Sequence, residues 1–460
     1  MTAAAPRMRR PVPGATRPYH FPRFELRRLS NGVQLVVAPI AKLPLVTIIA
    51  LIDAGAVCDA QAREGVAQLT AKLLLEGTEA SDGAELTERF ERLGASVESH
   101  ADWDVAAVSV TALSQNVREA LALLAEVLRS PAFREREVER LKAERNAELL
   151  QLQAEPRGLA DELFSRFLYA PASRYARPDG GDAESVAAIT RDDIERFYRA
   201  RYQPAAVTIV VAGDLRADRA ESLLAETLGD WQGARVQAVT TNDAPARRTR
   251  AIHVVAKPDA PQSELRVGHV GIPRTHPDYF AVVVMNAVLG GLFSSRINLN
   301  LREAHGYTYG AFSSFDWRRQ AGPFAVSTAV RSDVTDASAR EILVEIDRMR
   351  SERIMQDELS LATSYLDGVF PIRYETTAAI AAALANKVIY GLPDDFFDRY
   401  RDRVRAVSAE DVLSAAKTHL QSEALQLVVV GDPAVVRPPL EALQLGPVAV
   451  YDALGRPLST

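Results

Sequence analysis

The sequence predicts an α+β fold made of two tandem homologous domains. Three landmarks of the first half recur in the second half at an offset of 218 residues, namely Thr190–Ile194 at Ser408–Val412, Val210–Asp214 at Val428–Asp432, and Ala67-Gln68 at Met285-Asn286. Landmarks that share one offset indicate duplication. Length supports the same reading, because 460 residues, 47% of them hydrophobic, can fill one core in each of two domains.

Each half is expected to hold a sheet covered by helices. The run 45–53 is almost continuously apolar, which suits a strand buried on both faces. Thr190 and Asp193 form a capping signal for the helix that follows. In the first half, strands are expected at 33–38, 45–53, 95–112 (as one or two strands) and 207–212, and helices at 65–76, 83–93, 117–128, 134–155, 159–169 and from 191 onward. In the second half, an apolar helix is expected to start near Tyr279.

Composition shifts divide the chain. The start is rich in Pro, Ala and Arg, and residues 233–250 combine Gly, Thr, Asn, Asp and Pro with Arg247, Arg248 and Arg250 near their end. The predicted parts are a flexible N-terminal arm at 1–22, a first domain at 23–235, a linker at 236–250, a second domain at 251–446, and a C-terminal tail at 447–460. Two domains opposed across a linker leave a cavity between them.

Overall charge and cysteine content exclude several classes of function. A net charge of −6 gives no basic balance for nucleic acid, and no apolar run approaches membrane-spanning length. The single cysteine, Cys58, excludes an intrachain disulfide and multi-cysteine metal motifs. The basic start lacks the apolar segment of a secretory signal. We therefore expect a cytoplasmic protein, with a periplasmic location left open if a signal segment has been removed.

The helix at 65–76 has the geometry of a metal site without its ligands. Gln68 and Lys72 lie one turn apart on a shared face, as the two histidines of a zinc peptidase helix do. Ala71 occupies the place of the catalytic carboxylate. Because an amide, a methyl group and an ammonium cannot bind Zn²⁺ or activate its water, no metal is expected in this chain.

The surroundings of this helix resemble the insulinase/pitrilysin family of zinc metallopeptidases, which includes the mitochondrial processing peptidases. The family reads approximately G-L-A-H-L-L-E-H-M-x-F-x-G-T here, and the matching residues are Gly65, Ala67, Leu69, Gly77 and Thr78. The resemblance implies mostly antiparallel sheets in two domains that face each other as a half-clam. It also assigns the degenerate zinc-site positions, which are Gln68, Ala71, Lys72 and, at the place of the third ligand, Glu148.

A second motif of the resembled family is complete. Leu301-Arg302-Glu303, Gly306 and Tyr309 match its L-R-E-x-x-G-x-x-Y signature. By resemblance, Arg302 and Tyr309 form the pair that holds bound peptide. A guanidinium fork and a phenol would donate hydrogen bonds to a peptide carbonyl and stabilise charge developing on it. The alternative is that Arg302 pairs locally with Glu303 or another acid while Tyr309 lies in the core.

Other residues give no second metal site at sequence level. None of the seven histidines has another histidine three or four positions away, and His419 with Glu423 is an isolated pair. Lys72 is expected to fill the vacated site with positive charge and to pair with Glu148. A separation of their side chains greater than about 6 Å would contradict this pairing.

The resemblance implies a non-catalytic, substrate-binding subunit of a heterodimeric zinc metallopeptidase. The expected partner is a homologous chain with an intact H-x-x-E-H motif, which carries the Zn²⁺, and the expected substrates are unfolded peptides. The strand region 95–112 corresponds to the one that pairs with bound peptide, although an ordinary internal hairpin is the alternative. Two other functions stay open, a structural subunit like the core subunits of respiratory complexes and a peptide-binding, chaperone-like homodimer.

Overall fold

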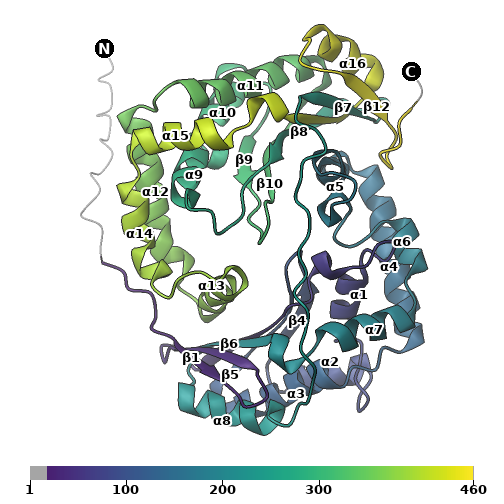
Figure 1. Cartoon of the computed structure of the whole chain (residues 1–460), viewed down its shortest axis with the longest axis vertical. Coiled ribbons are helices and arrows are strands. Elements are labelled where there is room, and N and C mark those ends of the chain that lie inside the picture. The colour runs from purple at the N-terminus through teal and green to yellow at the C-terminus, as the bar shows by residue number, and fades with distance from the viewer. Residues whose placement is uncertain (1–17, 459–460) are drawn as a thin grey trace, which may run out of the picture.

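Two six-stranded sheets form the framework of the computed structural model, which describes residues 18–458 (Figure 1). The first sheet has the order β1-β2-β6-β3-β5-β4 and the second the order β12-β7-β11-β8-β10-β9. The strands are β1 (Glu25–Arg28), β2 (Gln34–Pro39), β3 (Leu45–Ile52), β4 (Ser96–Ala101), β5 (Ala106–Leu113), β6 (Val207–Gly213), β7 (Ala251–Ala256), β8 (Gln262–Val270), β9 (Ala311–Phe315), β10 (Pro323–Arg331), β11 (Gln426–Gly431) and β12 (Val448–Tyr451).

Both sheets are mostly antiparallel, as predicted. In the first sheet β2 and β6 run parallel, and the other neighbouring pairs are antiparallel. In the second sheet β7 runs parallel to both β11 and β12, and the remaining pairs are antiparallel. Together with the helices that cover both sheets, this confirms the predicted α+β fold of two domains.

The described chain has sixteen α-helices, some packed on the sheets and the others on neighbouring helices. Those of the first domain are α1 (Val66–Leu73), α2 (Gly83–Arg92), α3 (Val117–Arg129), α4 (Glu135–Ala154), α5 (Pro156–Leu168), α6 (Ala183–Ala188), α7 (Arg191–Arg201) and α8 (Ala217–Leu228). Those of the second are α9 (Tyr279–Asn286), α10 (Arg296–Asn298), α11 (Thr335–Ser351), α12 (Gln356–Arg373), α13 (Thr377–Tyr390), α14 (Phe396–Ala406), α15 (Ala409–His419) and α16 (Pro433–Ala442).

The sequence repeat is a structural repeat. Strands β2, β3, β5 and β6 correspond to β7, β8, β10 and β11, and each pair starts within one residue of the 218-residue offset. The capping signals also correspond, since Thr190 accepts from Asp193 N and Ser408 accepts from Asp411 N. The repeat therefore extends from the sheets to the local chemistry that starts α7 and α15.

The two ends of the chain differ from the predicted arm and tail. Residues 447–460 were predicted as a tail, but β12 extends the second sheet through them by pairing with β7. Residues 1–17 of the predicted arm lie outside the described residues. Residues 18–22 pack on the second domain, where the ring of Phe21 stacks on Phe397 at 4.2 Å and Tyr19 donates to the carbonyl of Tyr374 at 3.2 Å. Aromatic side chains therefore anchor this part of the arm.

One helix of each domain packs on the sheet of the other domain. Helix α5 of the first domain packs on β8 and β11, and helix α13 of the second domain packs on β3 and β6 (Figure 1). The two helices occupy nearly equivalent places in the repeat. Thr47 of β3 and Thr377 of α13 also share a hydrogen bond between hydroxyl groups at 3.1 Å.

This exchange explains why the central strands are apolar along their whole length. Along β2, Leu35 and Val37 belong to the core of the first domain, whereas Val36 and Ala38 belong to the core shared with the second domain. Successive side chains of a strand point to opposite faces. Each face of the first sheet therefore has its own buried layer, which is why a continuous apolar run was a sound predictor of β3 (Leu45–Ile52).

The stretch Tyr279–Ala304 is apolar and long enough to cross a membrane by composition alone, but more than half of its apolar 18-residue window is buried inside the protein. It comprises α9, a π-helical segment at Ala287–Gly291, α10 and a second π-helical segment at Leu299–Ala304. Its neighbours include α11, α12, α14 and α15. A helix that is apolar all round and enclosed in this way is typical of a protein core.

Truncating a side chain of α13 that packs on the first sheet should destabilise both domains together. Leu384 is fully buried and lies two turns along α13 from Thr377, on the face toward the first sheet. We expect Leu384→Ala to lower the free energy of unfolding by about 2–5 kcal/mol. The measurement is denaturant unfolding followed at Trp103 and Trp231 of the first domain and Trp317 of the second, which should report one transition.

The control is Leu361→Ala on α12, where the side chain is 48% exposed and the expected change is within about 0.5 kcal/mol. Loss of the Trp317 signal while the first-domain signals persist in Leu384→Ala would show that α13 does not couple the domains.

The packing of α5 on the second sheet should weaken in acid. His253 of β7 stacks on Phe167 of α5 at 4.2 Å, its Nε2 lies 3.1 Å from Gln426 Oε1, and burial lowers its pKa to about 4. The unfolded chain, with a histidine pKa of about 6.5, binds more protons between pH 6.5 and 4. Folding stability should therefore fall as the pH falls through this window, by up to about 1.4 kcal/mol per pH unit from this group.

Buried His269 shifts in the same direction, so the wild-type slope has contributions from both histidines. Denaturant unfolding at pH 7 and pH 5 should show a flatter pH dependence for His253→Gln than for the wild type. An unchanged slope would mean that His253 is protonated in the folded protein.

Candidate functional site

A buried carboxylate starts the helix that carries the predicted zinc-site positions. Gly65 caps α1 with a left-handed backbone (φ 99°) and no side chain to accept hydrogen bonds. Asp59 takes over this role, because its carboxylate accepts from Gly65 N at 2.8 Å and from Ala67 N at 3.0 Å. Burial raises the pKa of Asp59 to about 6, against the opposing effect of Arg174 Nη2 at 2.7 Å. The start of α1 is thereby fixed to the loop that follows α5.

The structure brings the predicted zinc-site positions of α1 and α4 together. Lys72 Nζ lies 3.3 Å from Glu148 Oε1 and 3.7 Å from Glu144 Oε1. The expected pairing of Lys72 with Glu148 is therefore confirmed, at about half the separation that would have contradicted it. Both side chains are partly exposed, so the pair contributes little to stability by itself.

Arg145 is a member of this cluster that the sequence analysis missed. Its Nη1 lies 3.2 Å from Glu148 Oε2, and its Nε and Nη2 donate to the carbonyls of Gly180 and Gly181. Burial opposes ionisation of Glu148, but the hydrogen bond from Arg145 and the charge of Lys72 outweigh it, and the pKa of Glu148 lies below its usual range. The only signal in the sequence was the i, i+3 spacing of Arg145 and Glu148.

These groups leave no room for metal chemistry at α1. Gln68 reaches toward Gly180, where a Cβ would lie 2.6 Å from Gln68 Oε1. Ala71 is fully buried, and its carbonyl accepts from Ser99 Oγ of β4 at 2.6 Å. Glu148 can donate electron pairs to a cation, but Lys72 and Arg145 already supply two positive charges around it. The cluster is an ion-pair network between α1 and α4.

Tyr309 lies next to β9, an edge strand of the second sheet, and Arg302 lies in the π-helical segment before it. Arg302 belongs to the π-helical segment Leu299–Ala304, with Nη1 3.5 Å from Glu303 Oε1 and its guanidinium 4.4 Å from the ring centre of Phe293. Tyr309 precedes β9 and is 95% exposed. The local pairing of Arg302 with Glu303 is thus present, whereas the alternative of a core Tyr309 is wrong. A phenol this exposed is free to meet a ligand.

The edge strands are β1 and β4 in the first sheet and β12 and β9 in the second. The region 95–112 is a hairpin in which β4 is the edge strand and β5 lies inside the sheet. Beside β9, a pocket of about 440 Å³ is lined by Tyr309 and Phe312 together with Arg157 and Asp161 of α5. The pocket therefore combines an exposed phenol, an apolar ring and charged side chains from both domains.

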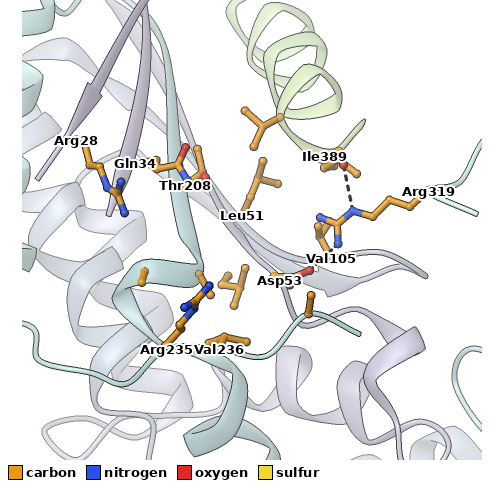
Figure 2. A pocket seen from close by; sticks show the side chains of 15 residues that line it. Arg28, Gln34, Leu51, Asp53, Val105, Thr208, Arg235, Val236, Arg319 and Ile389 are labelled. Carbon is orange, nitrogen blue, oxygen red and sulfur yellow. Dashed lines mark hydrogen bonds and ion pairs between the residues drawn. The ribbon is translucent and has the colours of Figure 1, made fainter. Parts of the chain in front are cut away.

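A larger pocket lies at the joint between the domains (Figure 2). It has a volume of about 610 Å³, and its walls come from the first sheet, the linker and the end of α13. Arg319 crosses it, donating to the carbonyl of Ile389 at 3.0 Å and pairing with Asp53 at 2.5 Å. None of the site residues predicted from sequence lines it.

Two histidines far apart in the sequence meet in space. The ligand atoms of His276, Asp278 and His419 lie within 4.8 Å of one another, and His419 Nε2 is 2.7 Å from Asp278 Oδ2. Imidazole nitrogen and carboxylate oxygen are donors that divalent transition metals accept. The same pair also joins the end of α15 to the start of α9. Sequence spacing could not reveal this cluster, because 141 residues separate Asp278 from His419.

Comparison with known protein families agrees with this geometry. A family model described as insulinase (peptidase family M16) matches residues 36–176, and a model described as peptidase M16 inactive domain matches residues 188–366. This chain belongs to the insulinase family. The first model lies within the first domain, whereas the second begins at the end of α6 in the first domain and ends within α12 of the second.

Relatives of this insulinase-family chain include processing peptidases and inactive homologues. A probable mitochondrial-processing peptidase subunit beta from Arabidopsis thaliana is 22% identical over 89% of this chain and 78% of that protein. The non-peptidase homolog YmxG from Helicobacter pylori is 24% identical over 80% of this chain and 84% of that protein. The crystal structure of a peptidase M16 inactive domain from Pseudomonas fluorescens has a TM-score of 0.83 and 28% identity over 89% of this chain and 98% of that one.

Restoring the zinc motif should create a metal site on α1. The variant Gln68→His, Ala71→Glu, Lys72→His places two imidazoles one turn apart opposite Glu148, which already lies 3.3 Å from the side chain at position 72. We expect this variant to bind one more Co²⁺ than the wild type, seen as a visible absorption band of the tetrahedral ion. The matched control adds Glu148→Gln, which should weaken this extra binding. Equal metal content in the triple variant and the wild type would show that these positions do not form the geometry of a zinc site.

Proposed function

We propose that this chain is the non-catalytic, substrate-binding subunit of a heterodimeric zinc metallopeptidase. Its partner is a homologous chain with an intact H-x-x-E-H motif, which supplies the Zn²⁺ and the general base. The substrates are unfolded peptides, held between the two chains while the partner cuts them.

One observation carries this proposal, the ion-pair cluster at the predicted zinc-site positions. Lys72 and Arg145 surround Glu148 with positive charge, and neither Gln68 nor Ala71 supplies a ligand or a base. A chain with this cluster has no means of activating water at α1. The names of similar proteins, an inactive domain and a non-peptidase homolog, also support a non-catalytic role.

The surface around β9 suits a peptide in an extended conformation. Edge strands such as β9 offer unpaired backbone groups, which can bind a peptide by strand addition. Tyr309 stands next to this edge with its phenol in solvent, and Arg302 carries a guanidinium held over Phe293. Bound peptide would satisfy the donors of both side chains. Glu303, at 3.5 Å, is a weak competitor that a peptide carbonyl can displace.

The pairing with a second chain is supported by relatives that are named as subunits. These relatives include a processing-peptidase subunit from Arabidopsis thaliana and a cytochrome b-c1 complex subunit from Bos taurus. Assembly into a two-chain enzyme would place the exposed Tyr309 opposite a zinc helix. The following test separates the proposed substrate-binding subunit from two other functions, a scaffold subunit and a chaperone-like homodimer.

Turnover should require both chains and the Arg302/Tyr309 pair. A fluorogenic peptide should be cut by the mixture of this chain and a zinc-bearing sister, and not by this chain alone. We expect Arg302→Ala and Tyr309→Phe to lower turnover of the mixture by about tenfold or more, because each removes a hydrogen bond to the reacting peptide. Size-exclusion chromatography of the mixtures should show unchanged assembly.

The control variants are Arg353→Ala and Tyr365→Phe. Both residues are exposed, Arg353 just after the end of α11 and Tyr365 on α12. Peptide binding by this chain without cleavage in any mixture would favour the chaperone-like homodimer, and silence in every assay would favour a scaffold. Full turnover by Arg302→Ala and Tyr309→Phe would remove the role of the pair.

A further inference from the structure

A further cavity lies in the second domain and shares no lining residue with the pocket beside Tyr309. This cavity, which we call the aromatic pocket, has a volume of about 560 Å³. Its walls are aromatic side chains from α9, α13, α14 and the loop after β9, including Tyr279, Trp317, Tyr390, Phe396 and Tyr400. On one side the small residues Ala379, Ala382 and Ala383 of α13 leave space between the rings.

A buried arginine lies in the wall of this pocket. Arg274 is only 9% exposed, and its guanidinium lies 3.6 Å from the ring centre of Tyr279 and 4.9 Å from that of Phe396. Within residues 18–458, no carboxylate or other acceptor forms an ion pair or hydrogen bond with its side chain. Burial lowers the pKa of Arg274, although the neighbouring tyrosines oppose this shift.

This guanidinium has no protein acceptor among the described residues, and its nitrogens remain accessible to solvent. Removing a charge from water costs several kcal/mol, and a carboxylate partner usually offsets the cost. Cation–π contact with Tyr279 and Phe396 returns about 0.5–2 kcal/mol per ring. The aromatic rings attract the positive charge at the flat face of the guanidinium. Its N–H donors point outward in the plane of the guanidinium and need oxygen acceptors.

The other charged groups at the pocket leave it positive. Asp316 lines the same cavity, but its carboxylate is paired with Arg318 at 2.5 Å. Arg373 also lines the cavity and adds a second guanidinium. On the far side of Arg274, an adjoining pocket of about 550 Å³ is lined by Arg399, which is paired with Asp395, and by Arg403. An anion entering the aromatic pocket therefore meets net positive charge.

We propose that the aromatic pocket binds a small organic anion, a carboxylate or phosphate group joined to a flat apolar body. The oxygens of the anion would accept hydrogen bonds from Arg274 in the two-pronged arrangement that guanidinium favours. The apolar body would stack on the rings of Tyr279 and Trp317 above the alanine side of the pocket. This site belongs to the chain alone and does not depend on a peptidase partner.

The test is isothermal titration of the full chain with four probes. 3-Phenylpropionate and phenyl phosphate carry both the anion and the ring, 3-phenylpropanamide lacks the charge, and acetate lacks the ring. We expect saturable binding of at least one of the first two probes, and the better of them identifies the anionic group. The amide and acetate should bind at least about tenfold more weakly, since each loses one half of the recognition.

Two variants locate the binding in this pocket. Arg274→Gln removes the charge and should weaken the better probe by at least about tenfold. Because Arg274 is buried and its replacement can disturb folding, Ala382→Trp provides a second variant, which fills the cavity from an exposed position of α13. Arg399→Gln is the matched control, since Arg399 lines the adjoining pocket only.

The proposal fails if neither anionic probe binds the wild-type chain. It also fails if binding survives both Arg274→Gln and Ala382→Trp, because the anion would then lie elsewhere. Loss of binding in Arg399→Gln with retention in Ala382→Trp would assign the anion to the adjoining pocket and overturn the present assignment. None of these outcomes bears on peptide turnover with a zinc-bearing sister.

Discussion

The exchange of helices between the two sheets is the constraint on which the rest of the structure depends. Helix α5 covers the second sheet and helix α13 covers the first, so neither domain completes its core without the other. A sheet with two buried faces needs apolar residues at successive positions, which is the pattern of β3 and β6. The exchange also fixes the distance between the domains and forms the walls of the pockets at the joint.

The candidate site follows from this arrangement and from charge. Helix α4 leads directly into the exchanged α5, and it presents Arg145 and Glu148 to Lys72 on α1. The result is a set of paired side chains in the place where the family resemblance puts a metal. Tyr309, in contrast, is exposed next to an edge strand. The first region is an ion-pair network, and the second presents an exposed phenol at the edge of a sheet.

Much of the fold could be predicted, but contacts between distant segments could not. The apolar run of β3, the capping signals at Thr190 and Ser408 and the repeat at one offset each reflect local chemistry, and the structure agrees with them. Strand β12 was missed because a short strand is stabilised by its pairing with β7 rather than by its own pattern. Arg145 was missed because its role depends on loop carbonyls at Gly180 and Gly181 that only folding brings near.

By itself, the sequence determined the duplication, many of the helices and strands of the first half, and the residues Gln68, Ala71 and Lys72 at the predicted zinc-site positions. Each of these features can be recognised from residue types and from their spacing over a few neighbouring positions. Tertiary structure alone decided which helix covers which sheet, the exposure of Tyr309, and the isolation of Arg274 among aromatic rings. Those features depend on packing between segments far apart in the chain, where burial and the absence of a counter-ion are set by the whole fold.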